Sequence, residues 1–163
     1  MKTRNQTNVR AEPGRQELFI TREFDAPREL VYKAYVDPEL IVQWLGPRDL
    51  TMRIDRYDCR TGGSYRYVHV DKNGNEYGFN GVVHEATAPE RVIQTFEFEG
   101  MPQRGHVSLD IALFEELPGG RTRVTMQSVF RSVGDRDGMI QAGMERGITE
   151  GFERLDEVLE KIK

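Results

Sequence analysis

The sequence is poor in the residues that build disulfides, zinc sites and membrane spans. Cys59 is the only cysteine among the 163 residues, which excludes an intrachain disulfide and a four-cysteine zinc site. No run approaches the roughly 18 consecutive apolar residues that a transmembrane helix needs. The first fourteen residues also lack the apolar stretch of a secretory signal, so we expect a cytoplasmic protein.

Clusters of positive charge are missing too. The 23 lysines and arginines are scattered and are outnumbered by 27 aspartates and glutamates, for a net charge of −4. Nucleic-acid-binding domains carry a basic patch or stripe, so we expect no nucleic-acid partner. The three histidines do not stand at ligand spacing with a cysteine or a carboxylate, so neither a metal nor another cofactor is expected.

The chain does contain enough apolar residues, 37%, for one ordinary domain. A chain of this length buries about 70% of its unfolded surface, so its core needs no covalent staples. Residues 1–14 are polar, include Pro13 and Gly14 and lack periodicity, which predicts a disordered N-terminal tail. Residues 15–163 are predicted to fold as a single domain.

The longest regular pattern predicts an amphipathic helix over residues 135–163. Apolar side chains recur there at steps of three and four, which keeps one face of a helix apolar. Glycines recur at steps of four along the edge of that face, and each costs a helix roughly 1 kcal/mol relative to alanine. We therefore expect the glycines either to let the backbone approach its neighbour closely or to leave room for a bound molecule. The apolar residues are Ile140, Met144, Ile148, Phe152, Leu155, Leu159 and Ile162, and the glycines are Gly143, Gly147 and Gly151.

Short alternating segments between residues 15 and 130 predict antiparallel strands. The first covers residues 15–25, and two short helices follow it, each with a proline near its start, Pro27 and Pro38. Six further strands with short connections are predicted at 50–58, 64–70, 76–86, 91–98, 105–114 and 121–130. The fold class is thus α+β, a curved antiparallel sheet of six to seven strands wrapped around the long C-terminal helix. Because a curved sheet cannot touch a straight helix everywhere, we expect a cavity between them.

Several segments of this chain stand together in the order seen in one protein family. They are Phe24-Asp25-Ala26-Pro27, Trp44-Leu45-Gly46-Pro47, Thr61-Gly62-Gly63-Ser64-Tyr65, Gly81-Val82-Val83, Pro118-Gly119-Gly120 and Gly143-Met144-Glu145-Arg146-Gly147. With them, residues 17–162 resemble the START-like, birch-pollen-allergen-like (SRPBCC) superfamily. Within it, they resemble the family similar to the activator of the heat-shock-protein-90 ATPase.

The resemblance implies a helix-grip fold with a deep hydrophobic cavity between the helix and the sheet. Across the superfamily this cavity holds lipids, hormones, polyketides or other apolar molecules, and the resemblance implies no fixed catalytic residue. The chain departs from the family at two helix positions, where Ile148 and Gly151 stand in place of a frequent tryptophan and serine. Both changes remove bulk or polarity from the face that would line the cavity.

Candidate ligand-binding residues come from the faces that would line such a cavity. Tyr65, Tyr67 and His69 alternate on one face of the 64–70 strand, where the histidine would anchor a ligand or be satisfied by a neighbour. Trp44 would lie at the cavity mouth or plug the core. The other candidates are aromatic, sulfur-containing and helix residues, for which ordinary core packing is the alternative. They are Phe79, Phe96, Met126, Met144, Gly147, Ile148 and Gly151.

No catalytic residue is assigned. Ser64 and Ser128 lack a nucleophile elbow or a base at defined spacing, and Cys59 has no partner motif, which favours a structural thiol. The acids of the strands and loops are predicted to lie on solvated faces. These acids are Glu85, Glu97, Glu99 and Asp110.

We therefore expect a protein that binds a small apolar molecule, lipid-like or aromatic, without catalysing a reaction. Two alternatives stay open. One is a chaperone ATPase-activator-like interaction module, which the short N-terminal tail disfavours. The other is a polyketide cyclase- or aromatase-like enzyme, which would need a buried ionisable group with a shifted pKa in the cavity. A homodimer is also left open.

Overall fold

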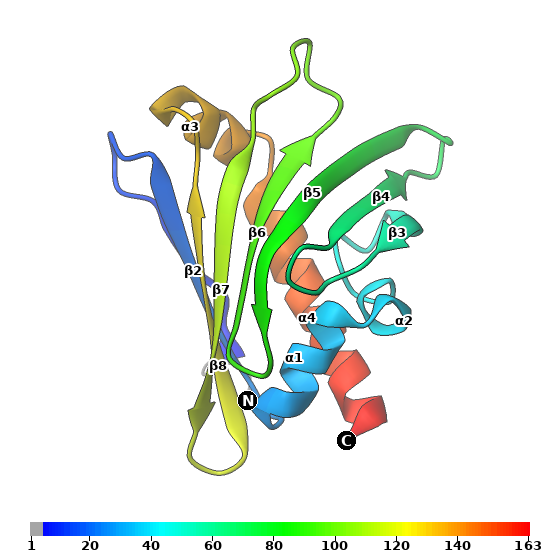
Figure 1. The fold of residues 1–163 in the computed structure, drawn as a ribbon, viewed down its shortest axis with the longest axis vertical. Coiled ribbons are helices and arrows are strands. Elements are labelled where there is room, and N and C mark those ends of the chain that lie inside the picture. The colour runs from blue at the N-terminus through cyan, green and yellow to red at the C-terminus, as the bar shows by residue number, and fades with distance from the viewer. Residues whose placement is uncertain (1–4) are drawn as a thin grey trace.

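The sheet is antiparallel throughout and ends at strands β1 and β3. The computed structural model describes residues 5–163, and within them lie eight strands and four helices (Figure 1). In chain order they are β1 (Asn8–Arg10), β2 (Glu17–Phe24), α1 (Arg28–Val36), α2 (Pro38–Ile41), β3 (Thr51–Tyr57), β4 (Ser64–Val70), β5 (Glu76–Thr87), β6 (Arg91–Phe98), β7 (Ser108–Leu117), β8 (Arg121–Val129), α3 (Val133–Gln141) and α4 (Met144–Ile162).

The chain crosses the sheet once and then returns strand by strand. In the order β1-β2-β8-β7-β6-β5-β4-β3, the connection from β2 to the far edge carries α1 and α2, and β3 to β8 form a meander. Helix α1 packs against β7, β8 and α4. Helices α1 and α4 therefore both lie on the concave side of the sheet (Figure 1). This arrangement confirms the predicted α+β helix-grip fold. Among the four helices, none is long and apolar enough to cross a membrane.

The sheet has one strand more than the sequence predicted, because part of the expected tail is ordered. Strand β1 pairs with β2, with Val9 opposite Ile20. Asn5 is buried, donates from Nδ2 to Asp25 Oδ2 at 3.1 Å, and accepts at Oδ1 from Arg121 Nη2 at 2.8 Å. A strand of three residues is too short to show alternation in the sequence. Residues 1–4 of the expected tail lie outside the described residues.

The pattern over residues 135–163 predicted one continuous helix, but the structure has two helices there. Helix α3 ends at Gln141 and α4 begins at Met144. Between them Gly143 has φ +90°, a left-handed conformation that a residue with a Cβ rarely adopts. The apolar residues Ile140 and Met144 keep their spacing of four across the break, so periodicity alone hides it.

The middle of α4 contacts the loop that follows α2 very closely. A Cβ on Gly151 would lie 3.2 Å from the Trp44 carbonyl oxygen and 3.3 Å from the Gly46 nitrogen. On the next turn, Arg154 donates to the carbonyl oxygens of Gln43, Gly46 and Pro47 at 2.9, 3.2 and 3.3 Å. Gly151 therefore serves close packing, which was one of the two expectations for the glycines of this helix.

Gly147 stands one turn earlier and has more room. A Cβ there would meet only the Pro47 Cδ atom, at 3.5 Å, which is ordinary van der Waals contact. Gly147→Ala should therefore raise the free energy of unfolding by up to about 1 kcal/mol, the difference in helix propensity. Gly151→Ala should lower it, because the added methyl group presses on backbone atoms. Urea unfolding of both variants checks this, and an equal gain at the two positions would contradict it.

Candidate functional site

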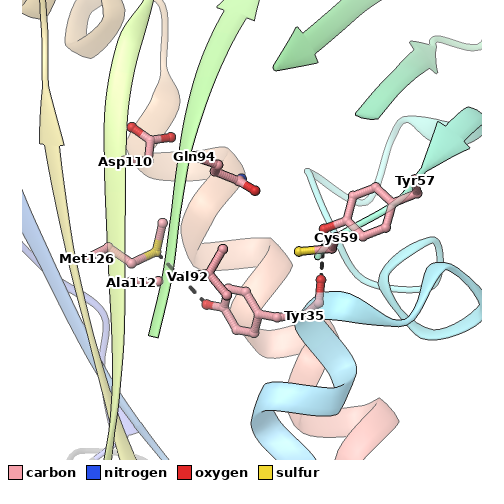
Figure 2. Close-up of a pocket in the computed structure, with 8 residues that line it drawn as sticks. All are labelled: Tyr35, Tyr57, Cys59, Val92, Gln94, Asp110, Ala112 and Met126. Atoms are coloured by element: carbon pink, nitrogen blue, oxygen red, sulfur yellow. Dashed lines mark hydrogen bonds between the residues drawn. The ribbon is translucent and has the colours of Figure 1, made fainter. Parts of the chain in front are cut away.

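A pocket of about 40 Å³ lies between the concave face of the sheet and helix α1 (Figure 2). We call it the inner pocket. Strands β6, β7 and β8 supply one wall, and α1, β3 and the loop after β3 supply the other. A second hollow of about 90 Å³, formed by residues between Arg10 and Phe19, is lined mainly by charged side chains. The inner pocket is lined by Tyr35, Tyr57, Cys59, Val92, Gln94, Asp110, Ala112 and Met126.

A row of polar side chains crosses the sheet at the inner pocket. Gln94 on β6 pairs with Asp110 on β7, and Asp110 pairs with Ser128 on β8, so the three side chains lie on one face. Ser108 Oγ donates to Asp110 Oδ1 at 3.2 Å. Within residues 5–163, no lysine, arginine or histidine forms an ion pair with Asp110. Asp110 is partly buried, and the partners of its carboxyl group are hydroxyls.

Burial changes the acidity of this carboxyl group. Loss of hydration raises the pKa of Asp110 from 3.8 to about 6, while hydrogen bonds from Ser128 and Ser108 oppose the rise. The prediction that Asp110 lies on a solvated strand face was wrong. On β7 the apolar residues Leu109 and Leu113 face outward and are 40% and 38% exposed, so the polar and small residues between them face inward.

Gln94 presents a second unusual group in the inner pocket. Its Oε1 atom is buried and accepts no hydrogen bond from residues 5–163. Figure 2 shows its amide pointing away from the sheet, toward the side of the pocket that holds Tyr57 and Cys59. A buried acceptor without a partner costs about 1–3 kcal/mol, so the fold carries an unfavourable group at this position.

The opposite wall consists of groups that stay neutral. The Tyr57 hydroxyl donates to the Tyr35 carbonyl oxygen at 2.8 Å, and the Tyr35 hydroxyl lies 3.9 Å from the sulfur of Met126. Burial raises the pKa of both tyrosines far above the ordinary value. Burial also raises the pKa of the Cys59 thiol to about 11, so little of the nucleophilic thiolate is present at neutral pH.

Several residues predicted from the sequence gather beside the inner pocket. We call Tyr65, Tyr67, His69, Phe79 and Phe96 the aromatic cluster. The ring centres of Tyr67 and Phe79 are 5.2 Å apart and those of Phe79 and Phe96 are 5.4 Å apart, and both pairs are stacked. Phe79 and Phe96 remain partly exposed. The cluster thus forms an apolar surface on strands β4, β5 and β6.

The inner pocket and the aromatic cluster are continuous. Tyr57 and Cys59 line the pocket and also pack against the core group that contains Tyr65, Tyr67 and Phe79. The hydroxyl of Tyr65 is already engaged, because it donates to the Thr95 carbonyl oxygen at 2.6 Å. The two surfaces therefore make one candidate site, with its polar groups at Asp110 and its stacked rings alongside.

His69 packs against the loop after α2, at Gly46, and does not line the inner pocket. It is only 6% exposed, and a Cβ on Gly46 would lie 2.7 Å from its Cε1 atom. Its Nε2 atom is buried and has no hydrogen-bond partner in the described part of the chain. Burial lowers the pKa of His69, so the ring is neutral at pH 7.

The remaining predicted residues do not line the inner pocket, with the exception of Met126. Trp44 is 2% exposed and donates from Nε1 to the Ala34 carbonyl oxygen at 3.0 Å, which matches the alternative of a core plug. Met144, Gly147 and Ile148 lie on the first half of α4 and are partly exposed.

Sequence reasoning missed most of the residues that line the inner pocket. Asp110 was misplaced because the more apolar register of β7, with Leu109 and Leu113, faces outward. A usable signal was present, since Ser108, Asp110 and Ala112 stand at alternate positions and would give one small, polar face. Tyr35 and Cys59 lie outside the strands and carry no such signal.

Comparison with known proteins shows the family of the chain. Residues 25–160 match the model described as "Activator of Hsp90 ATPase homolog 1-like protein". The chain belongs to this family. The resemblance to the SRPBCC superfamily is thereby confirmed. No protein with a curated description matches the chain.

Solved structures similar to this family member come from several bacteria. A Rhodobacter sphaeroides protein has a TM-score of 0.86 at 24% identity, over 96% of this chain and 99% of its own. Protein Ms6760 from Mycobacterium smegmatis has a TM-score of 0.85 at 23% identity, over 97% and 99%. An Arthrobacter aurescens protein has a TM-score of 0.85 at 25% identity, over 94% and 91%. These similarities support the fold.

Asp110→Asn should stabilise the protein near neutral pH. The folded state ionises Asp110 only at about pH 6, whereas the unfolded state ionises it near its ordinary pKa. The stability that the acid form provides is therefore complete at low pH and is lost as pH rises through about 6. The difference in free energy of unfolding between Asp110→Asn and the unmodified protein should therefore be up to about 3 kcal/mol more favourable to the variant at neutral pH than at low pH. This is the value for one carboxyl group whose pKa moves from 3.8 to about 6.

Urea unfolding from about pH 4 to about pH 8 measures this difference. Glu116→Gln, at the exposed end of the same strand, is the matched control and should show no comparable divergence from the unmodified protein. If the Asp110→Asn curve runs parallel to that of the unmodified protein over the whole range, the carboxyl group is not desolvated.

Proposed function

We propose that the protein binds a small, mostly apolar molecule in the candidate site formed by the inner pocket and the aromatic cluster. The observation that carries this proposal is the pair of polar groups set into the apolar concave face. Asp110 has no cation partner and Gln94 Oε1 has no donor among the described residues. A ligand with a polar head would supply both partners.

The free-energy cost of these groups favours a function over a structural role. A sheet face that serves only to pack against helices is most stable when its inward side chains are apolar, because each buried acceptor without a donor costs about 1–3 kcal/mol. Ionisable groups with strongly shifted pKa values concentrate at functional sites. Binding pockets combine apolar walls with a few polar groups that orient the ligand, which is the composition found here.

The size of the inner pocket limits how a ligand can bind. At about 40 Å³ it is far smaller than the roughly 300–1,000 Å³ of sites for drug-sized molecules. We propose that the polar head enters the inner pocket and that the apolar part lies along the aromatic cluster. Phe79 and Phe96 are partly exposed there, and Tyr57 and Cys59 join the two surfaces.

Native mass spectrometry of the freshly purified protein, beside its denatured mass, tests the proposal directly. We expect a copurifying small molecule, or an increase in Tm when small lipophilic compounds are added, because a ligand that binds only the folded state stabilises it. A protein that carries no molecule and gains no stability from such compounds would contradict the proposal.

Ala112→Val locates the site. Its two added methyl groups would occupy the inner pocket, which Ala112 lines, so the stabilisation by ligand should be lost while the strand tolerates a β-branched residue. Leu113→Val changes the neighbouring side chain on the outer face, where Leu113 is 38% exposed, and should leave binding unchanged. Circular dichroism confirms that both variants fold. Amide NMR shifts on ligand addition locate the site in the unmodified protein as well.

A further inference from the structure

We propose that the ligand is an apolar amine whose ammonium group binds between Asp110 and Gln94. This inference rests on the proposed function and names the chemical class of its ligand. It follows from three properties of the inner pocket, which are the type of its polar atoms, the charge it can hold and the apolar surface beside it.

The first property is that the pocket offers two acceptor groups, one from each of two paired residues. Gln94 and Asp110 form a cross-strand pair on the concave face, and they offer a carbonyl oxygen and a carboxyl group. The carbonyl oxygen of Gln94 has no donor within residues 5–163. An ammonium group carries three donors and can bind both residues at once, whereas a hydroxyl group has only one donor.

The second property is the balance of charge around Asp110. The titratable groups that face it are Tyr35 on α1, Tyr57 on β3, Cys59 in the following loop, and Tyr65 and Tyr67 on β4. All five are protonated and neutral at pH 7, and burial raises the pKa of each still further above neutral pH.

The arginine whose charge acts on the inner pocket already forms an ion pair. Arg22 on β2 influences Tyr35, but it donates two hydrogen bonds to the carboxylate of Asp156, at 2.9 and 2.7 Å. An ionised Asp110 thus has no compensating charge in the described part of the chain. A cationic ligand supplies one, and an anionic ligand would add a second negative charge to a weakly hydrated site, which is costly.

The third property is the apolar surface that continues from the inner pocket. The stacked rings of Tyr67, Phe79 and Phe96 offer a wall for a flat or flexible hydrocarbon group. Figure 2 shows the Gln94 amide pointing toward Tyr57 and Cys59, the residues that join the inner pocket to the aromatic cluster. The polar head and the apolar body of one molecule can therefore be satisfied together.

Four probes with one apolar ring test the inference, namely benzylamine, benzyl alcohol, benzoate and toluene. Binding is measured by titration of amide NMR spectra near pH 7.5. Benzylamine should bind roughly tenfold to hundredfold more tightly than toluene, since this is the contribution of hydrogen bonds to a charged group. Benzyl alcohol should fall between them, and benzoate should bind more weakly than toluene.

Two variants separate this site from general attraction to an acidic protein. Asp110→Asn should reduce the affinity for benzylamine to that for benzyl alcohol and leave toluene binding unchanged. Glu116→Gln removes the same charge from the exposed end of β7 and should leave all four affinities unchanged. In the unmodified protein, benzylamine affinity should fall as pH drops below about 6, where Asp110 gains a proton.

Each other outcome contradicts the inference. If toluene and benzyl alcohol bind as tightly as benzylamine, the site takes apolar molecules without selecting an amine, and the proposed function stands alone. If Asp110→Asn binds benzylamine as the unmodified protein does, the ammonium binds elsewhere. If none of the four probes shifts the spectra of the lining residues, both the inference and the proposed function fail.

Discussion

The structure depends on the contact between the apolar face of α4 and the concave side of the sheet. Phe152, Leu155 and Leu159 are almost fully buried there, and each large apolar side chain removed from water contributes about 1.5–3 kcal/mol. Gly151 and Arg154 bring the loop after α2 onto the middle of the same helix. Helix α1 packs against α4 and against β7 and β8, and the inner pocket lies between α1 and the sheet.

Much of the fold could be predicted from the sequence, because its signals are local. Turn residues separate the strands, and alternation marks seven of the eight strands within the described residues. The break at Gly143 could not be predicted, since the apolar spacing continues across it. Strand β1 could not be predicted either, because pairing between Asn8–Arg10 and β2 is a long-range interaction that leaves no pattern in three residues.

The candidate site was predicted only in part, and the reason is the register of one strand. The aromatic rings of β4, β5 and β6 do lie together in the structure, although the sequence did not show which face of β5 looks inward, because Val82 and Val83 are both apolar. On β7 the more apolar register faces outward, as the exposure of Leu109 and Leu113 shows. Hydrophobicity therefore indicated the wrong face of this strand, and Asp110, the chemically most distinctive group of the site, was assigned to solvent. Burial of an acid is decided by tertiary packing, which periodicity does not record.

The pairing of β2 with β8 also constrains how the chain can fold. A hydrogen bond across this pair, from Gln127 Nε2 to Glu17, joins residues separated by 110 positions, whereas β3 to β8 pair with their immediate neighbours in sequence. Closing so long a loop has an entropic cost that local contacts do not share. During synthesis, β2 and α1 leave the ribosome well before their partners in the sheet. Leu18 and Ile20 are buried in the folded protein and cannot pair with β8 until that strand has been translated, so this segment presents apolar surface to aggregation or to chaperone capture in the meantime.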